Sequence, residues 1–363
     1  MSAVTLFGAA AIAAQFAIPA TAPAQGAAQG AAQGAAQGAP QRNGTVVTDT
    51  LWSQALGASK SLVVYLPPSY GVESTRRYPV AYYLHGATGD ETNWTKLGRV
   101  AEVMDSLVAA GMPEMIVAMP DGDAYSYYTT YNVLLTAAGC RGLMVPTGGS
   151  AERDCVAWPH YDDYIVYDVV RHVDTKYRTM STRARRAIAG LSMGGYGAIT
   201  LALQYPTTFA AAASHSGVLW PVERAPFSRP LTRSVADSTS FARATERSAP
   251  RLRVVFGADS ASWYARDPAS IATRLVAAGT LLPALYVDAG AQDVYTPESR
   301  AFVAAVSARA VTVEYHEWPG AHTWDYWRAH VGESLAWIAA RINGPGTLPA
   351  TRPGSGPDAG SPR

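Results

Sequence analysis

A serine flanked by glycines is the residue of this chain with the clearest chemical potential. The stretch Gly190-Leu191-Ser192-Met193-Gly194 follows a short apolar run at 186–189 and precedes a segment with helical spacing at 194–205. A sharp strand-to-helix turn holds a serine hydroxyl above the edge of a sheet, and the glycines lack the β-carbons that would collide there. The pattern predicts that Ser192 is a nucleophile for acyl transfer. A tight turn with an inert serine is the alternative.

An acyl-transfer site also needs hydrogen-bond donors for the negative oxygen of a tetrahedral intermediate. We expect the N–H of Met193, the residue after the nucleophile, to be one donor. A glycine-containing loop at 84–89 follows an earlier predicted strand, and the N–H of Ala87 in it is the candidate for the second donor. We expect His85 and Gly86 of the same loop to contact the substrate.

Candidates for the base and its acidic partner follow later in the chain. His322 lies after the last predicted core strand, where a loop can carry a base to the serine. Asp288 and Asp293 both fit the order nucleophile, acid, base. We prefer Asp293, because a carboxylate on a loop can reach a second loop, and expect it to hold the tautomer of His322. Asp288 is better explained as a strand-end cap. His215, at the end of another predicted strand, is expected to line the pocket.

Apolar runs and helical spacings alternate between these residues. The apolar runs are short and continuous, which is typical of strands buried on both faces. The alternation predicts an α/β domain whose mostly parallel sheet is covered by helices on both faces. Strands are expected at 60–66, 78–84, 115–119, 186–189, 253–256, 283–287 and 311–315, and helices at 97–110, 161–177, 194–205, 271–278, 296–308 and 324–342.

Both ends of the 363-residue chain differ from its middle. Residues 1–24 are nearly uncharged and apolar and end in a small-x-small triplet, which predicts a secretory signal peptide, with a membrane anchor as the alternative. Residues 25–43 repeat Gln, Gly and Ala, and residues 344–363 are rich in Gly, Pro and Ser, so we expect a flexible linker and a disordered tail. The catalytic domain is expected at 44–343, in a secreted or periplasmic protein without a stable membrane anchor.

Composition excludes several classes of function. The chain has 29 Lys and Arg against 28 Asp and Glu, so no basic excess is present to bind a nucleic-acid backbone. Two cysteines are too few for a disulfide scaffold or a four-cysteine zinc site. The sequence contains no H-E-x-x-H, Cys-x-x-Cys or phosphate-loop motif, so we expect no metal and no cofactor. The oligomeric state is left open.

Taken together, the motifs resemble the esterase D-like branch of the α/β hydrolases, over roughly residues 57–342. That branch includes feruloyl esterases, acetyl xylan esterases, S-formylglutathione hydrolases and mycolyltransferase antigens. The resemblance implies an α/β-hydrolase fold with nucleophile, acid and base at Ser192, Asp293 and His322, which supports Asp293 over Asp288. The motifs that carry it are Tyr83 to Gly89 with Asn93-Trp94, Ala187 to Ala198, Asp288 to Asp293, and Glu317 to Arg328.

The chain departs from the family pattern after the strand at 115–119. The segment 124–159 is longer than the usual connection and contains both cysteines, Cys140 and Cys155. In an exported protein these are expected to form a disulfide, with free buried thiols as the alternative.

Tyrosines crowd the start of this insertion. Tyr127 and Tyr128 lie close after Asp121, at the end of a strand that faces the site, so all three are candidates for contacts with an aryl or sugar ring. Packing of a long loop onto the body of the protein explains the tyrosines equally well.

Three functions are compatible with these residues. The first is an exported serine esterase that acts on short-acyl or aryl esters of the acetyl or feruloyl type, either small or linked to a polysaccharide. The second is an acyltransferase that uses the same three catalytic residues. The third is a non-catalytic binding protein with a hydrolase fold, against which the complete set of catalytic residues argues.

Overall fold

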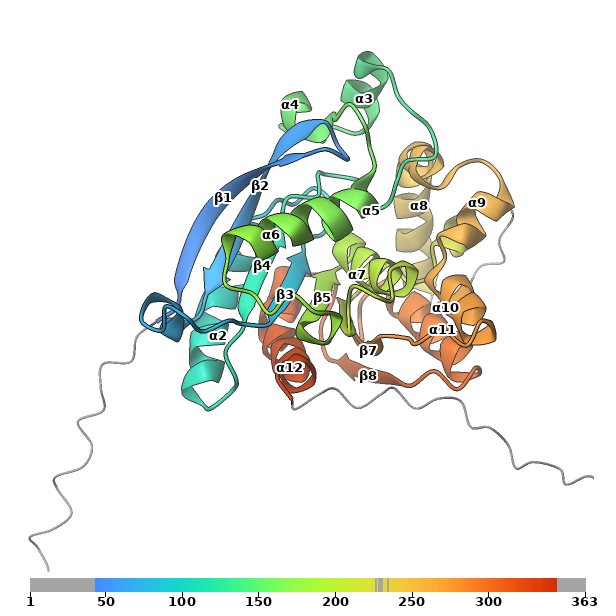
Figure 1. Ribbon diagram of the computed structural model, residues 1–363. Coiled ribbons are helices and arrows are strands. Elements are labelled where there is room, and N and C mark those ends of the chain that lie inside the picture. The colour runs from blue at the N-terminus through green and yellow to red at the C-terminus, as the bar shows by residue number, and fades with distance from the viewer. Residues whose placement is uncertain (1–42, 226, 228–230, 234, 345–363) are drawn as a thin grey trace, which may run out of the picture. The chain divides into compact units, whose positions relative to one another are not determined.

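One eight-stranded sheet organises the part of the chain that the computed structural model describes, residues 43–344 apart from 226, 228–230 and 234 (Figure 1). The predicted signal peptide at 1–24, and nearly all of the predicted linker and tail, lie outside the described residues. Among the described residues, no helix has the length and apolar character needed to cross a membrane.

The sheet is mostly parallel. In spatial order the strands are β1 (Thr45–Ser53), β2 (Ala58–Leu66), β4 (Ile116–Pro120), β3 (Val80–Leu84), β5 (Arg186–Leu191), β6 (Ala211–His215), β7 (Ala284–Gly290) and β8 (Val313–Trp318). β2 pairs antiparallel with β1 and β4, whereas β3 to β8 are parallel to one another. The carboxyl ends of β3 and β5 to β8 therefore meet at one edge, where loops that carry functional groups collect.

Helices cover both faces of the sheet. Because successive side chains of a strand point to opposite faces, Tyr82 packs into one hydrophobic core and Tyr83 into the other. The core around Tyr83 packs beneath α1 (Asn93–Lys96), α2 (Val100–Ala109) and α12 (Trp324–Ile342). The core around Tyr82 contacts α5 (Tyr161–Asp163), α6 (Val170–Lys176), α7 (Met193–Gln204), α8 (Val235–Phe256), α9 (Ser260–Ala265), α10 (Pro268–Ala277) and α11 (Thr296–Ser307). This arrangement confirms the predicted α/β class.

Two local predictions differ from the structure, and one strand was not predicted. The expected strand at 253–256 is the last turn of α8; its apolar side chains are buried there, and a short apolar run does not distinguish a buried helix from a strand. β1 escaped prediction because it is an edge strand that exposes alternate residues and contains few large apolar ones. The expected helix at 161–177 is interrupted by a π-helical segment, Tyr164–Val169.

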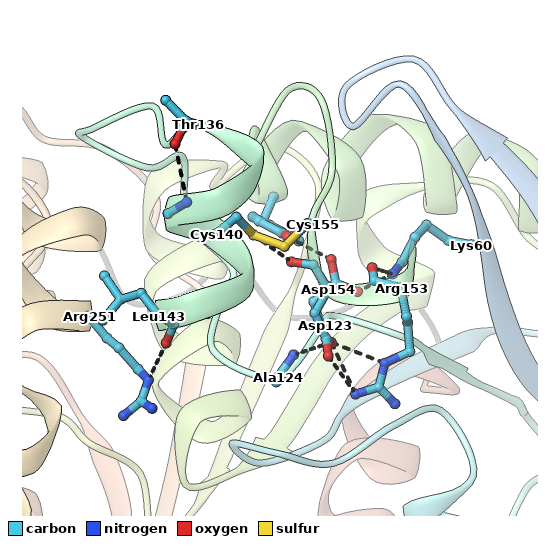
Figure 2. The surroundings of a disulfide bond; sticks show 12 residues. Lys60, Asp123, Ala124, Thr136, Cys140, Leu143, Arg153, Asp154, Cys155 and Arg251 are labelled. Carbon is cyan, nitrogen blue, oxygen red and sulfur yellow. Dashed lines mark hydrogen bonds and ion pairs between the residues drawn. A yellow bond between two sulfur atoms is a disulfide. The ribbon is translucent and has the colours of Figure 1, made fainter. Parts of the chain in front are cut away.

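The insertion at 124–159 is bound to the body of the domain by polar contacts. It contains α3 (Ala137–Leu143) and α4 (Ala151–Asp154), and a disulfide joins Cys140 to Cys155 (Figure 2). Buried Asp154 accepts a hydrogen bond of 3.1 Å from the N–H of Ala124. The guanidinium of Arg251 in α8 donates to the carbonyl of Leu143 at 2.7 Å. The first of these contacts lies within the insertion, and the second ties α3 to α8.

A buried lysine provides a further attachment point. Lys60 of β2 lies 2.9 Å from Asp121, also forms an ion pair with Asp123, and donates to the carbonyl of Arg153 at 3.2 Å. Tyr161 donates to Asp123 at 2.6 Å. Asp121 therefore has a structural partner, which accounts for the aspartate at this strand end without substrate contact.

Replacing both cysteines with serine is expected to destabilise the domain. The bridge closes a loop of 15 residues, for which loop entropy corresponds to about 3 kcal/mol in the free energy of unfolding. Urea unfolding, followed by circular dichroism, measures the difference. The parent protein unfolded with reductant is the matched control and should approach the stability of the variant; equal stability of variant and oxidised parent would contradict the prediction.

Candidate active site

Ser192 lies between β5 and α7 in a backbone conformation that an ordinary residue rarely adopts, with φ 53° and ψ −115°. Neighbouring glycines make the turn possible. A β-carbon on Gly190 would lie 2.4 Å from the carbonyl oxygen of Gly194, and one on Gly194 would lie 2.4 Å from that of Leu84. The N–H of Ser192 donates to the carbonyl of His215 at 2.9 Å. Such strain costs about 1–3 kcal/mol and persists only where surrounding contacts hold it.

A histidine and an aspartate complete a hydrogen-bonded chain with this serine. His322 Nε2 lies 2.9 Å from Ser192 Oγ, and His322 Nδ1 lies 2.7 Å from Asp293 Oδ2. Asp293 is buried, and its other oxygen accepts from the N–H of Tyr295 at 2.9 Å. Since an ionised carboxylate only accepts, Nδ1 carries the proton and Nε2 is left to accept from the serine. The arrangement can remove the proton from the hydroxyl of Ser192.

Two backbone N–H groups beside Ser192 lack an acceptor among the described residues: those of Ala87 and Met193. Gly86 allows the first to come close, since a β-carbon at Gly86 would lie 3.5 Å from the Cβ of Ser192 and 2.5 Å from a Leu191 methyl. The second begins α7, whose N-terminus adds partial positive charge. Together they can stabilise an oxyanion formed on an attacked carbonyl.

His85 orients one of these donors from behind. It is buried, its Nε2 accepts a hydrogen bond from the N–H of Gly122 at 2.8 Å, and its Nδ1 lies 2.8 Å from the carbonyl oxygen of Gly86. Because Gly122 supplies the proton at Nε2, the ring proton lies on Nδ1 and is donated to Gly86. The peptide unit is planar and trans, so fixing the Gly86 carbonyl turns the Ala87 N–H the opposite way.

A cavity of about 390 Å³ opens in front of Ser192. Of the ten residues that line it, only His322 can carry a charge near neutral pH. The ring of His322 is held edge-on between Tyr295 and Trp327, at centroid distances of 4.8 and 4.9 Å. Trp324 lies edge-on to Trp327 at 5.3 Å. The lining residues are Gly86, Ala87, Thr88, Asn93, Leu191, Ser192, Tyr295, His322, Trp324 and Trp327.

Buried charges pack against Tyr295. The guanidinium of Arg224 lies 4.7 Å above the Tyr295 ring and donates to Glu298 at 3.1 Å. Arg233 donates to Glu223 at 2.5 Å and also to the carbonyl of Val294. Burial raises the pKa of Glu298 to about 7, despite its contact with Arg224.

The structure brings together only part of the predicted substrate-contacting set. Gly86 lines the cavity, whereas His85, Asp121, Tyr127, Tyr128 and His215 are buried and do not line it. His215 instead lies 2.7 Å from Asp288, deep in the core. These five side chains were expected to contact substrate; instead they are buried behind the residues that line the cavity.

The two tyrosines pack rather than face the cavity. Tyr127 contacts Tyr196 and Phe256 edge-on at 5.8 and 5.4 Å. Tyr128 donates to the carbonyl of His85 at 3.1 Å and packs where Gly197 leaves room for its ring. The tyrosines at the start of the insertion therefore pack the loop onto the body of the protein, which was the alternative to substrate contact.

Other cavity residues were not singled out from the sequence. Trp324 and Trp327 both follow His322 closely and are three positions apart, as on one face of a helix, and Tyr295 follows Asp293 by two positions. Their closeness in sequence to the predicted acid and base was a usable signal. Thr88, Asn93 and Leu191 belong to the motifs already recognised, but nothing in the sequence shows the direction of their side chains.

Comparisons with known proteins identify the family of the chain. The sequence model of a family described as "Putative esterase" matches residues 53–338, which confirms the resemblance predicted from the motifs. An endo-1,4-beta-xylanase/feruloyl esterase of Xylanibacter ruminicola is 29% identical over 171 residues, which are 46% of this chain and 21% of that protein. An acetyl esterase of Caldicellulosiruptor saccharolyticus is 22% identical, over 71% of this chain and 82% of that protein. The chain thus spans about a fifth of the length of the first of these relatives.

Solved structures support the α/β-hydrolase fold. A ferulic acid esterase superposes with a TM-score of 0.56 at 27% identity, over 83% of this chain and 99% of that structure.

His85→Ala is expected to slow labelling of Ser192 by a fluorophosphonate by about 10- to 100-fold, because the peptide that carries the Ala87 N–H loses its anchor. Intact-mass spectrometry over time measures the rate, and circular dichroism checks the fold. The control is His316→Ala, a histidine whose side chain is 38% exposed, which should label at the parental rate. An unchanged rate in folded His85→Ala would contradict the positioning role of His85.

Glu298→Gln is expected to flatten the pH dependence of stability. The pKa of Glu298 in the folded protein is about 7, against an ordinary 4.5. Between these values the folded state retains a proton that the unfolded state has lost, so this group lowers the free energy of unfolding as pH rises through that window.

The measurement is urea unfolding of parent and Glu298→Gln from pH 4.5 to 7.5, compared with Glu102→Gln, whose side chain is 56% exposed. If parent and Glu298→Gln show parallel pH profiles, the raised pKa of Glu298 is wrong.

Proposed function

The chain belongs to the Esterase family, and on that premise we propose that it is an exported serine esterase that hydrolyses uncharged carboxylic esters through an acyl-enzyme on Ser192. The observation that carries the proposal is the chain of contacts from Ser192 to His322 to Asp293, at 2.9 and 2.7 Å, beside two unused backbone donors. Export rests on the apolar character of residues 1–24.

The proposed reaction has two half-reactions. His322 Nε2 takes the proton of Ser192 as Oγ attacks the carbonyl carbon, and the resulting oxyanion accepts hydrogen bonds from the N–H groups of Ala87 and Met193. His322 then gives the proton to the departing alcohol, and the acyl-enzyme remains. Water, deprotonated by the same nitrogen, attacks the acyl carbon and restores Ser192 with release of the acid. Asp293 keeps the ring oriented and stays ionised throughout.

The cavity lining supports an uncharged substrate that contains a ring. Trp324, Trp327 and Tyr295 offer aromatic surface next to the nucleophile, which suits an aryl group or the apolar face of a sugar. A glutathione thioester, with its two carboxylates and an ammonium group, would find no side chain other than His322 among the lining residues that can carry a charge near neutral pH. The relatives named as feruloyl esterase and acetyl esterase accord with an aryl or short acyl group.

A substrate panel with matched variants tests the proposal. The parent is expected to hydrolyse p-nitrophenyl acetate and methyl ferulate and to leave S-formylglutathione largely intact. Ser192→Ala should lose at least about 10⁴-fold in kcat/KM, while Ser150→Ala, which changes an exposed serine of the insertion, should keep parental activity. Full activity of Ser192→Ala would overturn the assignment.

The same assay separates the acyltransferase alternative. When simple alcohols or sugars are added and the products are analysed by mass spectrometry, the free acid should dominate. If a transesterified product dominates instead, the protein is an acyltransferase and not a hydrolase. Absence of both turnover and Ser192 labelling in the parent would favour a non-catalytic binding protein.

A further inference from the structure

A second Ser–His–Asp constellation lies in the core behind the active-site cavity. β6 and β7 pair so that His215 stands opposite Asp288, with Nδ1 2.7 Å from Oδ2. Ser334 of α12 places its hydroxyl 2.8 Å from His215 Nε2. All three residues are fully buried, so substrate has no access to them. Their two separations are close to the 2.7 and 2.9 Å of the chain that ends at Ser192.

The protons are arranged differently in this second set. Ser334 has one hydroxyl proton and donates it to the carbonyl of Val331 at 3.0 Å. Tyr83 Oη and His215 Nε2 lie 2.9 and 2.8 Å from the same oxygen, so both must donate to it. His215 Nδ1 and Asp288 Oδ2 lie 2.7 Å apart, but their orientation does not make a hydrogen bond. Because His215 Nε2 donates to Ser334, that nitrogen cannot take a proton from the serine.

The backbone at these strand ends holds two strained serines. The N–H of Ser192 donates to the carbonyl of His215 at 2.9 Å, and the N–H of Ser216 donates to the carbonyl of Asp288 at 2.7 Å. Both serines have a positive φ, 53° and 51°. Conformations of this kind persist only where neighbouring structure fixes them. The contact between His215 and Asp288 holds together the two strand ends that supply both acceptors.

The helix that follows the proposed base is tied to the same pair. Tyr326 donates to the second carboxylate oxygen of Asp288 at 3.0 Å, and Trp327 Nε1 donates to Ser216 Oγ at 3.1 Å. Trp327 in turn lies edge-on to His322 at 4.9 Å. The beginning of α12 and the ends of β6 and β7 therefore share one buried polar network.

We propose that His215 is a positioning residue that, with Asp288 and Ser334, sets the placement of Ser192 relative to His322. It acts through backbone and packing contacts and touches neither the substrate nor the reacting atoms. The proposal rests on the acyl-enzyme function proposed above. In it, the second Ser–His–Asp set positions Ser192 and does not take part in proton transfer.

Two substitutions distinguish hydrogen bonding from mere volume. In Asp288→Asn, the side chain keeps its volume and can still accept from Tyr326, so the link of His215 to Ser334 and that of position 288 to α12 survive, and kcat is expected to stay within about 3-fold of the parent. In Asp288→Asn combined with His215→Phe, the volume is filled, no carboxylate is left unpaired, and the links to Ser334 are lost. There kcat should fall about 30-fold with KM changed less than about 3-fold.

Labelling of Ser192 by a fluorophosphonate should slow in parallel with kcat, in protein shown to be folded by circular dichroism. Leu62→Ala, a fully buried residue of β2 outside the network, is the control: it should lower Tm and leave kcat and labelling unchanged. Ser334→Ala cuts only the link to α12 and should reduce kcat about 5-fold, which keeps the test valid where the double variant does not fold.

Parental kcat and labelling rate in the folded double variant, or in Ser334→Ala where the double variant does not fold, would overturn the proposal. So would fluorophosphonate labelling of Ser334 in Ser192→Ala, because Ser334 would then be activated. If the parent protein does not hydrolyse esters, the proposed function is wrong. The rates of Ser192 labelling in the parent and the variants would still test the positioning role of His215.

Discussion

Ser192 stands above the sheet because backbone segments approach one another there more closely than a β-carbon permits. The carbonyls of Leu84 and His85 lie where side chains of Gly190 and Gly194 would be. Leu84 and His85 lead into the loop that offers the Ala87 N–H, and the glycines lead into the helix that offers the Met193 N–H. One close approach therefore places Ser192 and the N–H groups of Ala87 and Met193, so the relative geometry of the proposed nucleophile and oxyanion donors follows from steric exclusion and not from flexible side chains.

Polar groups around this centre fall into two layers. The layer that faces the cavity is nearly free of charge and rich in aromatic rings. Outside this layer lie buried pairs of ionisable side chains: Lys60 with Asp121, Arg224 with Glu298, and His215 with Asp288. Removing one partner of such a pair leaves an uncompensated buried charge, which is strongly destabilising. The cavity thus keeps an apolar surface while its supports have directional, polar contacts.

The sequence predicted the fold class and the order of the three proposed catalytic residues because both depend on patterns along the chain. Glycine spacing around Ser192 specifies a turn, and continuous apolar runs specify buried strands. The roles of His85 and His215 were missed for a physical reason: sequence places a residue at a strand end but does not say whether its side chain points toward the cavity or the core. The run at 253–256 shows a similar limit, since burial alone makes both strands and helix ends apolar. That Tyr295 and Trp327 line the cavity follows from their ring contacts with His322, which the sequence does not show.

The long separation in sequence between the proposed nucleophile and its proposed base bears on when reactivity can arise. Ser192 and His322 are 130 positions apart, and α12, which follows the base, also supplies Ser334 and the Tyr326 and Trp327 contacts. During synthesis the serine, its strained turn and both oxyanion donors emerge long before their proton acceptor. On the proposed function, a partly made chain holds the hydroxyl of Ser192 without its base, and activation of that hydroxyl waits for the segment that carries His322.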